Sequence, residues 1–325
     1  MLACMLLFNA EEAGQWFWVL PPQIKLLLGK QGKLMSVKQV ISKYQGPIFI
    51  LIASLCFSTT GTTQALAPEG ATPLVIGGMR LWLGFIALFF WCFFTNRLPN
   101  LKTWPLGVTF ISALGILGYQ LSFFAAAIKT GVAVSAVVAC GFIPIATGAL
   151  GFVFLKERPK LIWYLTTLAA VLGLVLLSFT PDMQANPIGL LLALFAATAY
   201  GFYAVFGKKV VMNNDPATVI MVLFAIGAFL VTPVFFIFPT AWILSVKGIL
   251  VALHLGLIAT ALGYTTYMAG LKTTPASTCA TINLSESIAA ACWGVFLLGE
   301  QLGMLHWMGM ALIFGGVVVL TLKSK

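Results

Sequence analysis

The chain has 325 residues, of which 61% are hydrophobic and only 8% are charged, and its formal net charge is +10. Soluble globular domains carry roughly 25% charged residues, so this composition excludes a soluble enzyme, a nucleic-acid-binding module and a disordered chain. The Lys and Arg residues stand in short clusters between long apolar runs. That pattern is typical of membrane topology rather than of nucleic-acid binding.

Residues 1–45 differ from the rest, because they contain Glu11, Glu12 and several lysines. Acids at these positions argue against a signal peptide, which has a basic start and an apolar core. We expect a cytoplasmic N-terminal extension, either a dispensable segment or an amphipathic helix lying in the membrane interface.

The remainder contains apolar stretches long enough to cross a bilayer, which takes about 20 residues. Their ranges are 46–66, 72–95, 104–127, 132–154, 160–180, 187–206, 217–238, 248–270, 276–298 and 303–322. Proline residues lie in most of the connections, and nothing alternates as in an outer-membrane barrel. The sequence therefore predicts an all-α integral membrane protein with ten transmembrane helices.

Orientation follows from the basic residues, which concentrate on the cytoplasmic side of membrane proteins. With a cytoplasmic amino terminus, only Lys129 and Lys247 lie outside, Arg80 lies within a span, and the other Lys and Arg residues lie inside. We therefore expect a multi-pass protein of the cytoplasmic (cell) membrane with both termini in the cytoplasm.

The second half of the sequence repeats the first. A shift of 143 residues places Lys129 on Lys272, Glu157 on Glu300 and Gly173 on Gly316, and a shift of 140 places Pro47 on Pro187 and Gly61 on Gly201. We expect repeats at 46–180 and 181–325. Because each half has an odd number of crossings, the repeats must be inverted, as in secondary transporters whose substrate site lies between the repeats.

At these positions the chain resembles EamA-type members of the drug/metabolite transporter superfamily. The resemblance covers about residues 46–322 and rests on Arg80, Ala126–Thr130, Pro144, Phe154–Arg158, Ala269–Thr273, Pro275–Ser277, Leu284–Ser287 and Leu297–Glu300. It implies ten helices, cytoplasmic termini and export of small metabolites. The family usually has Glu-Pro where this chain has Glu286-Ser287, a departure that removes a source of a helix kink.

Two charges lie inside predicted spans. Glu286 lies near the bilayer centre, where an acid costs about 2.5–3.5 kcal/mol and usually faces a partner or a wet cavity. It is a candidate for binding a substrate amine or coupling to protons, and the alternative is a structural hydrogen bond between helices. Arg80 stays charged, and either binds a substrate carboxylate or fixes the packing through backbone carbonyls or Glu286.

Polar and aromatic residues of several spans are candidates for lining the cavity. If the cavity resembles that of the family, spans one, three, four, six, eight and nine line it. The candidate substrate-binding residues are Tyr119, Gln120, Tyr200, Tyr264, Asn283 and Glu286. The repeat mates Glu157 and Glu300 lie at span ends, and we interpret them as gate or interface residues.

The sequence favours a secondary transporter that exports a small polar metabolite, such as an amino acid or an amine, with protons as a candidate coupling ion. The alternative is an integral membrane enzyme acting on a lipid-linked substrate, but no catalytic set of acids, histidines and nucleophiles is apparent. The cysteines form no CxxC pair and the two histidines are far apart, so we expect no metal site and no cofactor. We expect a monomer or a homodimer, with a small-molecule substrate and the lipid bilayer as partners and no nucleic acid.

Overall fold

The computed structural model describes residues 37–100, 102–179, 186–299 and 301–323. The chain divides into a first unit, Met1–Gln45, and a second unit, Gly46–Lys325. The predicted extension, residues 1–45, lies outside the described residues except for 37–45, which are helical. The second unit carries the features that follow.

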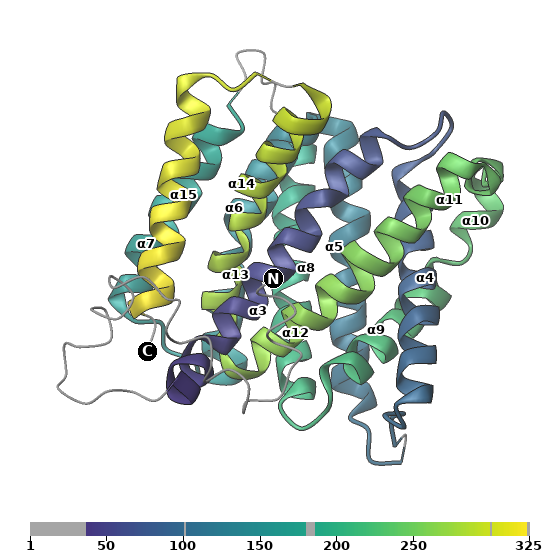
Figure 1. Ribbon diagram of the computed structural model, residues 1–325, viewed down its shortest axis with the longest axis horizontal. Coiled ribbons are helices and arrows are strands. Elements are labelled where there is room, and N and C mark those ends of the chain that lie inside the picture. The colour runs from purple at the N-terminus through teal and green to yellow at the C-terminus, as the bar shows by residue number, and fades with distance from the viewer. Residues whose placement is uncertain (1–36, 101, 180–185, 300, 324–325) are drawn as a thin grey trace. The chain divides into compact units, whose positions relative to one another are not determined.

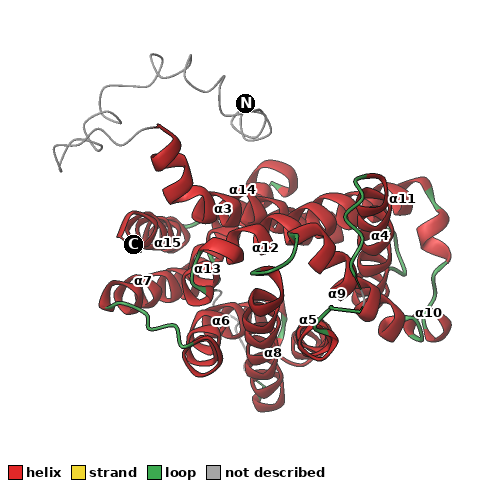
Figure 2. Cartoon of the chain, turned by 90° about the horizontal axis from the view of Figure 1, so that it is seen from below, coloured by secondary structure: helices red, strands yellow, loops and turns green. Residues whose placement is uncertain are grey.

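The described residues form helices and turns and contain no strand (Figure 2). In chain order the elements are α3 (Val37–Ala65), α4 (Pro73–Phe94), α5 (Leu106–Thr130), α6 (Val132–Leu155), α7 (Leu161–Leu177), α8 (Pro187–Val211), α9 (Pro216–Val231), α10 (Val234–Ile237), η2 (Ala241–Leu244), α11 (Val246–Leu253), η3 (His254–Leu262), α12 (Gly263–Thr273), α13 (Ala276–Asn283), α14 (Ser285–Trp293), η4 (Gly294–Leu298) and α15 (Met304–Lys323).

The ten predicted spans correspond to ten helical segments. Nine of the segments in the described part are long and apolar enough to cross a membrane, and three of them, Pro216–Ile237, Val246–Thr273 and Ala276–Leu297, combine several of the elements named above. The tenth, α7, has 17 residues, which is at the lower limit for a spanning helix. The all-α membrane fold is confirmed.

Polar residues before prolines begin several of these helices. The side chains of Thr72, Asn186 and Asp215 accept hydrogen bonds from backbone N–H groups of the first turns of α4, α8 and α9, and a proline follows each of them. Proline fits the first helical position because its missing N–H would be unpaired there in any case. Three of the prolines that mark connections in the sequence, Pro73, Pro187 and Pro216, thus mark helix starts.

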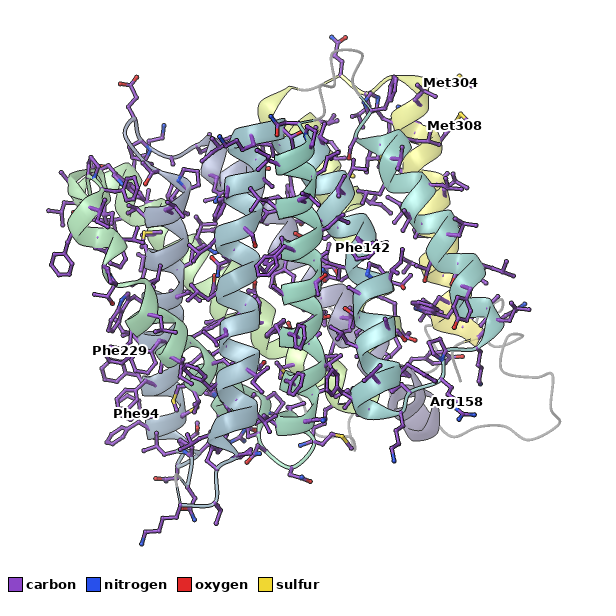
Figure 3. All side chains as sticks on the ribbon, turned by 180° about the vertical axis from the view of Figure 1, so that it is seen from behind. Phe94, Phe142, Arg158, Phe229, Met304 and Met308 are labelled. Carbon is purple, nitrogen blue, oxygen red and sulfur yellow. The ribbon has the colours of Figure 1, made fainter. Side chains whose placement is uncertain are left out.

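Large apolar side chains cover the outside of the bundle. Phe94, Phe229 and Met304 are 75%, 64% and 81% exposed, and Figure 3 shows them pointing away from the helices. A surface of this kind is favourable only in lipid. The chain is therefore a multi-pass membrane protein.

The packing of α7 against α15 shows the symmetry of the repeats. These helices lie together at one side in Figure 1. A Cβ added to Gly173 would lie 2.6 Å from the carbonyl oxygen of Gly309, and one added to Gly316 would lie 2.9 Å from that of Thr166. The 143-residue shift converts each of these contacts into the other. Two antiparallel helices related in this way place a pseudo-two-fold axis between them, as expected for inverted repeats.

The ninth span is interrupted near its middle. α13 ends at Asn283 and α14 begins at Ser285, with Ser287 N donating to Leu284 O at 3.1 Å. The chain therefore makes a turn at Leu284 although Ser287 stands where the family usually has proline, a point that the sequence left open. Glu286 follows the start of α13 by ten residues, about 15 Å of helix, so the break lies near the middle of the membrane.

Candidate functional site

A cavity of about 380 Å³ lies inside the bundle, and residues of both repeats line it. Its walls come from α3, α4, α5 and α6 of the first repeat and α8, α12, α13 and α14 of the second. Its lining is apolar in most places, with a few polar groups, which is the usual character of a small-molecule site.

Glu286 lies in the wall of this cavity at the break between α13 and α14. Asn283 Nδ2 donates to Glu286 Oε2 at 3.1 Å, and Ser54 Oγ donates to Asn283 Oδ1 at 3.0 Å. Ser54 lies on α3, so one amide side chain connects the carboxylate to the first helix of the other repeat. Glu286 itself has no cationic partner within ion-pair distance among the described residues.

Arg80 also reaches the cavity, from α4. Its Nε donates to Thr260 Oγ1 at 2.9 Å, in the π-helical stretch η3. This contact uses one of the five N–H groups of a guanidinium. The sequence did not place the second span in the cavity wall, because the family resemblance pointed to other helices.

Aromatic rings form a continuous layer at one end of the cavity. The ring centroids of Tyr119 and Tyr200 lie 5.2 Å apart in an edge-to-face arrangement, and those of Tyr200 and Tyr203 lie 5.3 Å apart. The ring centroid of Tyr264 lies 5.8 Å from that of Tyr203 and 4.7 Å from that of Phe57. Such pairs add roughly 0.5–1.5 kcal/mol each beyond their buried area. The layer is therefore a stable partition across the bundle.

The position of this layer determines where the cavity leads. We call the side of the bundle where Gly131 joins α5 to α6 the Gly131 face, and the side where α6 ends the Glu157 face. Tyr203 and Tyr267 are fully buried and lie one turn nearer the Glu157 face than Tyr200 and Tyr264, which line the cavity. The lining continues in the other direction to Val132, the first residue of α6, which is 67% exposed. The cavity is thus closed toward the Glu157 face and extends to the Gly131 face.

An ion pair lies at the closed side. Lys208 Nζ lies 2.7 Å from Glu157 Oε1, and Ala276 N donates to Glu157 Oε2 at 2.8 Å. The same Lys208 Nζ donates to the backbone oxygen of Thr274. These bonds join the end of α6, the last turn of α8 and the turn into α13. Because Lys208 is 8% exposed, the removal of either partner would leave an uncompensated charge, which is strongly destabilising.

The structure brings together all six predicted substrate-site residues, Tyr119, Gln120, Tyr200, Tyr264, Asn283 and Glu286, and adds Arg80. Glu157 lies apart from them in the ion pair, and its repeat mate Glu300 lies outside the described residues. Phe57 and Ser54 were not among the predicted residues. A serine or phenylalanine within an apolar span gives no signal of its own, because its partners lie more than 200 residues away in the sequence.

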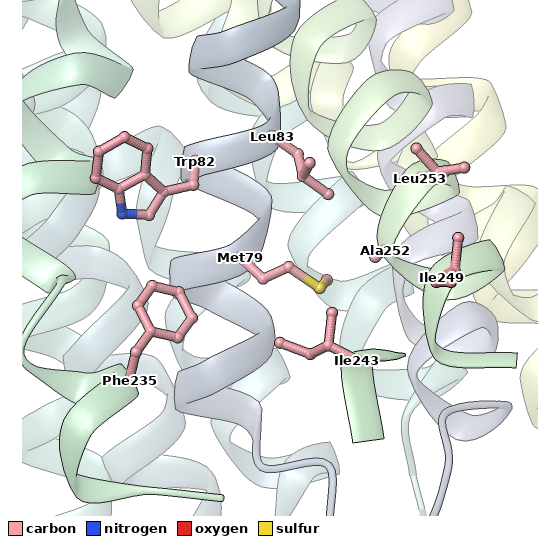
Figure 4. Close-up of a pocket in the computed structure, with 8 residues that line it drawn as sticks. All are labelled: Met79, Trp82, Leu83, Phe235, Ile243, Ile249, Ala252 and Leu253. Carbon is pink, nitrogen blue, oxygen red and sulfur yellow. The ribbon is translucent and has the colours of Figure 1, made fainter. Parts of the chain in front are cut away.

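A second cavity, of about 450 Å³, lies between α4, η2 and α11 (Figure 4). Met79, Leu83, Phe235 and Ile243 are among its apolar lining residues. Trp82 also lines it, and its Nε1 donates to Thr232 Oγ1 at 3.1 Å. This cavity offers nothing that would recognise a charged or polar metabolite, so the candidate site is the cavity that contains Glu286.

Comparison with known proteins agrees with this architecture. The chain is 37% identical over 279 residues to "Uncharacterized transporter YwfM" of Bacillus subtilis (strain 168), covering 86% of this chain and 94% of that one. It is 23% identical over 294 residues to "Uncharacterized inner membrane transporter YicL" of Salmonella typhimurium (strain LT2), covering 87% and 97%. A protein known from a crystal structure has the same fold, with a TM-score of 0.75 at 18% identity over 85% of this chain and 96% of that one.

The family comparison covers both repeats. The profile of the EamA-like transporter family matches residues 45–179 and again residues 187–322. Family membership and the transporter names of the relatives favour a membrane transporter over an enzyme. Two matches in succession, over most of the chain, show that the protein belongs to the EamA-like transporter family.

Proposed function

We propose that the protein is a secondary transporter that exports a small polar metabolite carrying an amine group, an amino acid or an amine, by alternating access. The observation that carries this proposal is the presence of Glu286 and Arg80 in the walls of one cavity between the repeats. Uncompensated charge at this depth is costly, and in membrane proteins it usually marks a substrate or ion pathway.

Each part of the cavity suits a different part of such a substrate. Glu286 would receive the amine, since its second oxygen accepts no hydrogen bond from the described residues. Arg80 would receive a carboxylate through the N–H groups that Thr260 does not use, or else it serves only to hold α4 against η3. The rings of Tyr119, Tyr200 and Tyr264 offer an apolar surface to the rest of the molecule. Gln120 and Asn283 complete the proposed site.

In alternating access, the Glu157 face would open while the Gly131 face closes. We propose that Glu157 acts as a gate residue, whose bonds to Lys208 and Ala276 N close the Glu157 face, and that Glu300 serves the opposite gate. The distribution of basic residues supports a cytoplasmic Glu157 face and cytoplasmic termini. The structure would then be outward-open, and export requires the Glu157 gate to open for loading.

Three further proposals concern organisation and coupling. The two family matches support a division into repeats at 46–180 and 181–325, with residues 1–45 as a cytoplasmic extension. Glu286 is a titratable group within the pathway, which supports coupling to protons. We expect a monomer or a homodimer, since each chain contains a whole cavity.

The experiment that tests the function is counterflow in proteoliposomes of the purified full-length protein. Three compounds with one side chain are compared: phenylalanine, its decarboxylated amine and its deaminated acid. Saturable exchange of the amino acid and the amine, with none of the acid, supports recognition by Glu286. Preference for the amino acid over the amine assigns the carboxylate to Arg80. Exchange of the acid alone would overturn the proposal, and so would the absence of exchange for all amines and amino acids.

A further inference from the structure

A groove of about 550 Å³ runs between α6 and α7 on the lipid-facing side of the bundle. Ile145, Phe152 and Leu168 line it and are 47%, 54% and 59% exposed. Its lining is mainly apolar, and it lies at the depth of the membrane occupied by these two spans. A groove of this kind fits a hydrocarbon chain.

A second, smaller pocket of about 170 Å³ adjoins the groove at the Glu157 face. The two share Pro159 and Trp163 in their walls. We call it the polar pocket after the charged and polar side chains in its wall, Arg158, Lys160 and Ser277, although most of its lining is apolar. Ser277 is 1% exposed, and its Oγ has no hydrogen-bond partner within the described structure.

The charge in this polar pocket is positive. Glu157 also lines it, but Lys208 and the backbone N–H of Ala276 already engage both oxygens of that carboxylate. Arg158 and Lys160 are exposed and make no ion pair with any described residue. Figure 3 shows Arg158 pointing away from the bundle at this end. Two cations and an unpaired hydroxyl therefore surround a space that opens into an apolar groove.

We propose that these two spaces form one binding site for an anionic phospholipid. The phosphate of the head group binds Arg158 and Lys160 and accepts a hydrogen bond from Ser277 Oγ. One acyl chain lies in the groove between α6 and α7. A zwitterionic lipid fills the groove equally well but gains less from the two cations, since basic residues at a membrane surface favour anionic lipids. The adjoining groove distinguishes a lipid from a free anion.

The site touches the element that closes the bundle. Glu157 lines the polar pocket and also bonds Lys208, and Ser277 belongs to the first turn of α13. A lipid phosphate bound there contacts both α13 and the segment that follows α6. The inference does not depend on which molecule the central cavity carries.

The test measures lipid binding by the full-length protein purified in detergent. Phosphatidylglycerol is compared with phosphatidylcholine of the same acyl chains by native mass spectrometry and by the shift in melting temperature. We expect phosphatidylglycerol to bind more tightly and to raise the melting temperature further. In Arg158→Gln/Lys160→Gln its affinity should fall by about tenfold or more. Lys102→Gln/Lys272→Gln, which removes two exposed cations from the same face, should bind as the wild type does.

Two further measurements distinguish a bound lipid from a free anion. Ala149 is exposed and lines the groove, so Ala149→Phe should block the acyl chain and weaken phosphatidylglycerol binding while all charges remain. Inorganic phosphate alone should stabilise the protein much less than the lipid. Equal binding of the two lipids, or wild-type affinity in the Arg158/Lys160 variant, would overturn the proposal. An effect of phosphate equal to that of the lipid would replace the lipid by a free anion.

Discussion

Glu286 is held by a chain of side chains rather than by a counter-charge. Ser54 donates to Asn283, and Asn283 donates to one oxygen of Glu286, a residue of the cavity wall. An amide donor stabilises a carboxylate less than a cation would. A substrate amine would therefore find an acid that is held in position and has no cationic partner among the described residues.

Replacement of this acid by its amide separates the functional role from the structural one. Glu286→Gln is nearly isosteric and cheaper to bury, so the melting temperature should stay at the wild-type value or rise. Counterflow of an amine substrate should fall at least about tenfold, equivalent to about 1.4 kcal/mol. Glu69→Gln, at an exposed loop position, is the matched control and should transport normally. Transport at the wild-type rate by the Glu286→Gln variant would end the assignment of Glu286 to the substrate site.

The candidate site could be predicted in part because polar residues in apolar spans are conspicuous. Glu286, Asn283 and Tyr119 are polar residues of this kind, and all line the cavity. Arg80 was equally conspicuous as a charge, but its place in the cavity depends on the packing of α4 against η3. Such packing depends on partners 180 residues apart in the sequence, which no local pattern encodes.

At the scale of elements, hydropathy predicts where the membrane spans lie, but it does not predict where their helices deviate from α-helical geometry. The break after Asn283 and the π-helical stretch His254–Leu262 both lie within segments that hydropathy predicts as uninterrupted spans. Neither segment contains a proline, the residue that usually allows such a break to be predicted. The first of these segments lines the cavity and the second binds Arg80, so both irregularities lie at the candidate site.

The break in the ninth span makes a prediction about proline tolerance. Position 287 lies in the first turn of α14, where proline removes one hydrogen bond, Ser287 N to Leu284 O, worth about 1 kcal/mol. Ser287→Pro should therefore lower the melting temperature only slightly. Ala289→Pro, inside α14, should cost about 3 kcal/mol or more. Thermal unfolding of both purified variants checks this, and equal destabilisation would mean that the ninth span is a continuous helix.

The α7–α15 contact depends on glycine, because the two backbones approach too closely for a side chain. A Cβ on Gly309 would lie 2.5 Å from the carbonyl oxygen of Gly173. Gly309→Ala should therefore destabilise the protein by about 1–3 kcal/mol, the usual cost of overpacking. Gly315→Ala is the control on the same helix, since nothing lies within 4 Å of its added Cβ. Equal melting temperatures of the two variants would contradict the close approach of the α7 and α15 backbones.

At the scale of the whole molecule, the structure is open on one face and closed on the other. The closed face combines the aromatic layer with the Glu157–Lys208 pair. In the open half, the cavity wall includes Cys140, whereas Cys279 is fully buried beside the ion pair. These two thiols therefore report on opposite sides of the partition.

Thiol labelling of single-cysteine proteins measures which face is open. Cys140, which lines the cavity, should react faster with a small polar maleimide than Cys279, which is fully buried. Glu157→Gln weakens the closed side, so it should raise the labelling rate of Cys279 several-fold and lower that of Cys140. Asp215→Asn, which removes the exposed ion pair with Arg97, should change neither rate. Unchanged labelling of Cys279 in the Glu157 variant would show that the ion pair does not hold the gate.

Lys208, the cation of the ion pair at the Glu157 face, has no basic counterpart in the first repeat. The 140-residue shift that relates the first parts of the repeats places Lys208 on Pro68, which has no charge. In the proposed alternating-access cycle, the two end states would therefore be unequal in energy even in the absence of substrate. Each 1.4 kcal/mol that favours closure of the Glu157 face makes the other state about tenfold rarer. Without substrate, the protein would accordingly populate mainly the state whose cavity opens to the Gly131 face. The step that reopens the Glu157 face would then limit the rate of turnover.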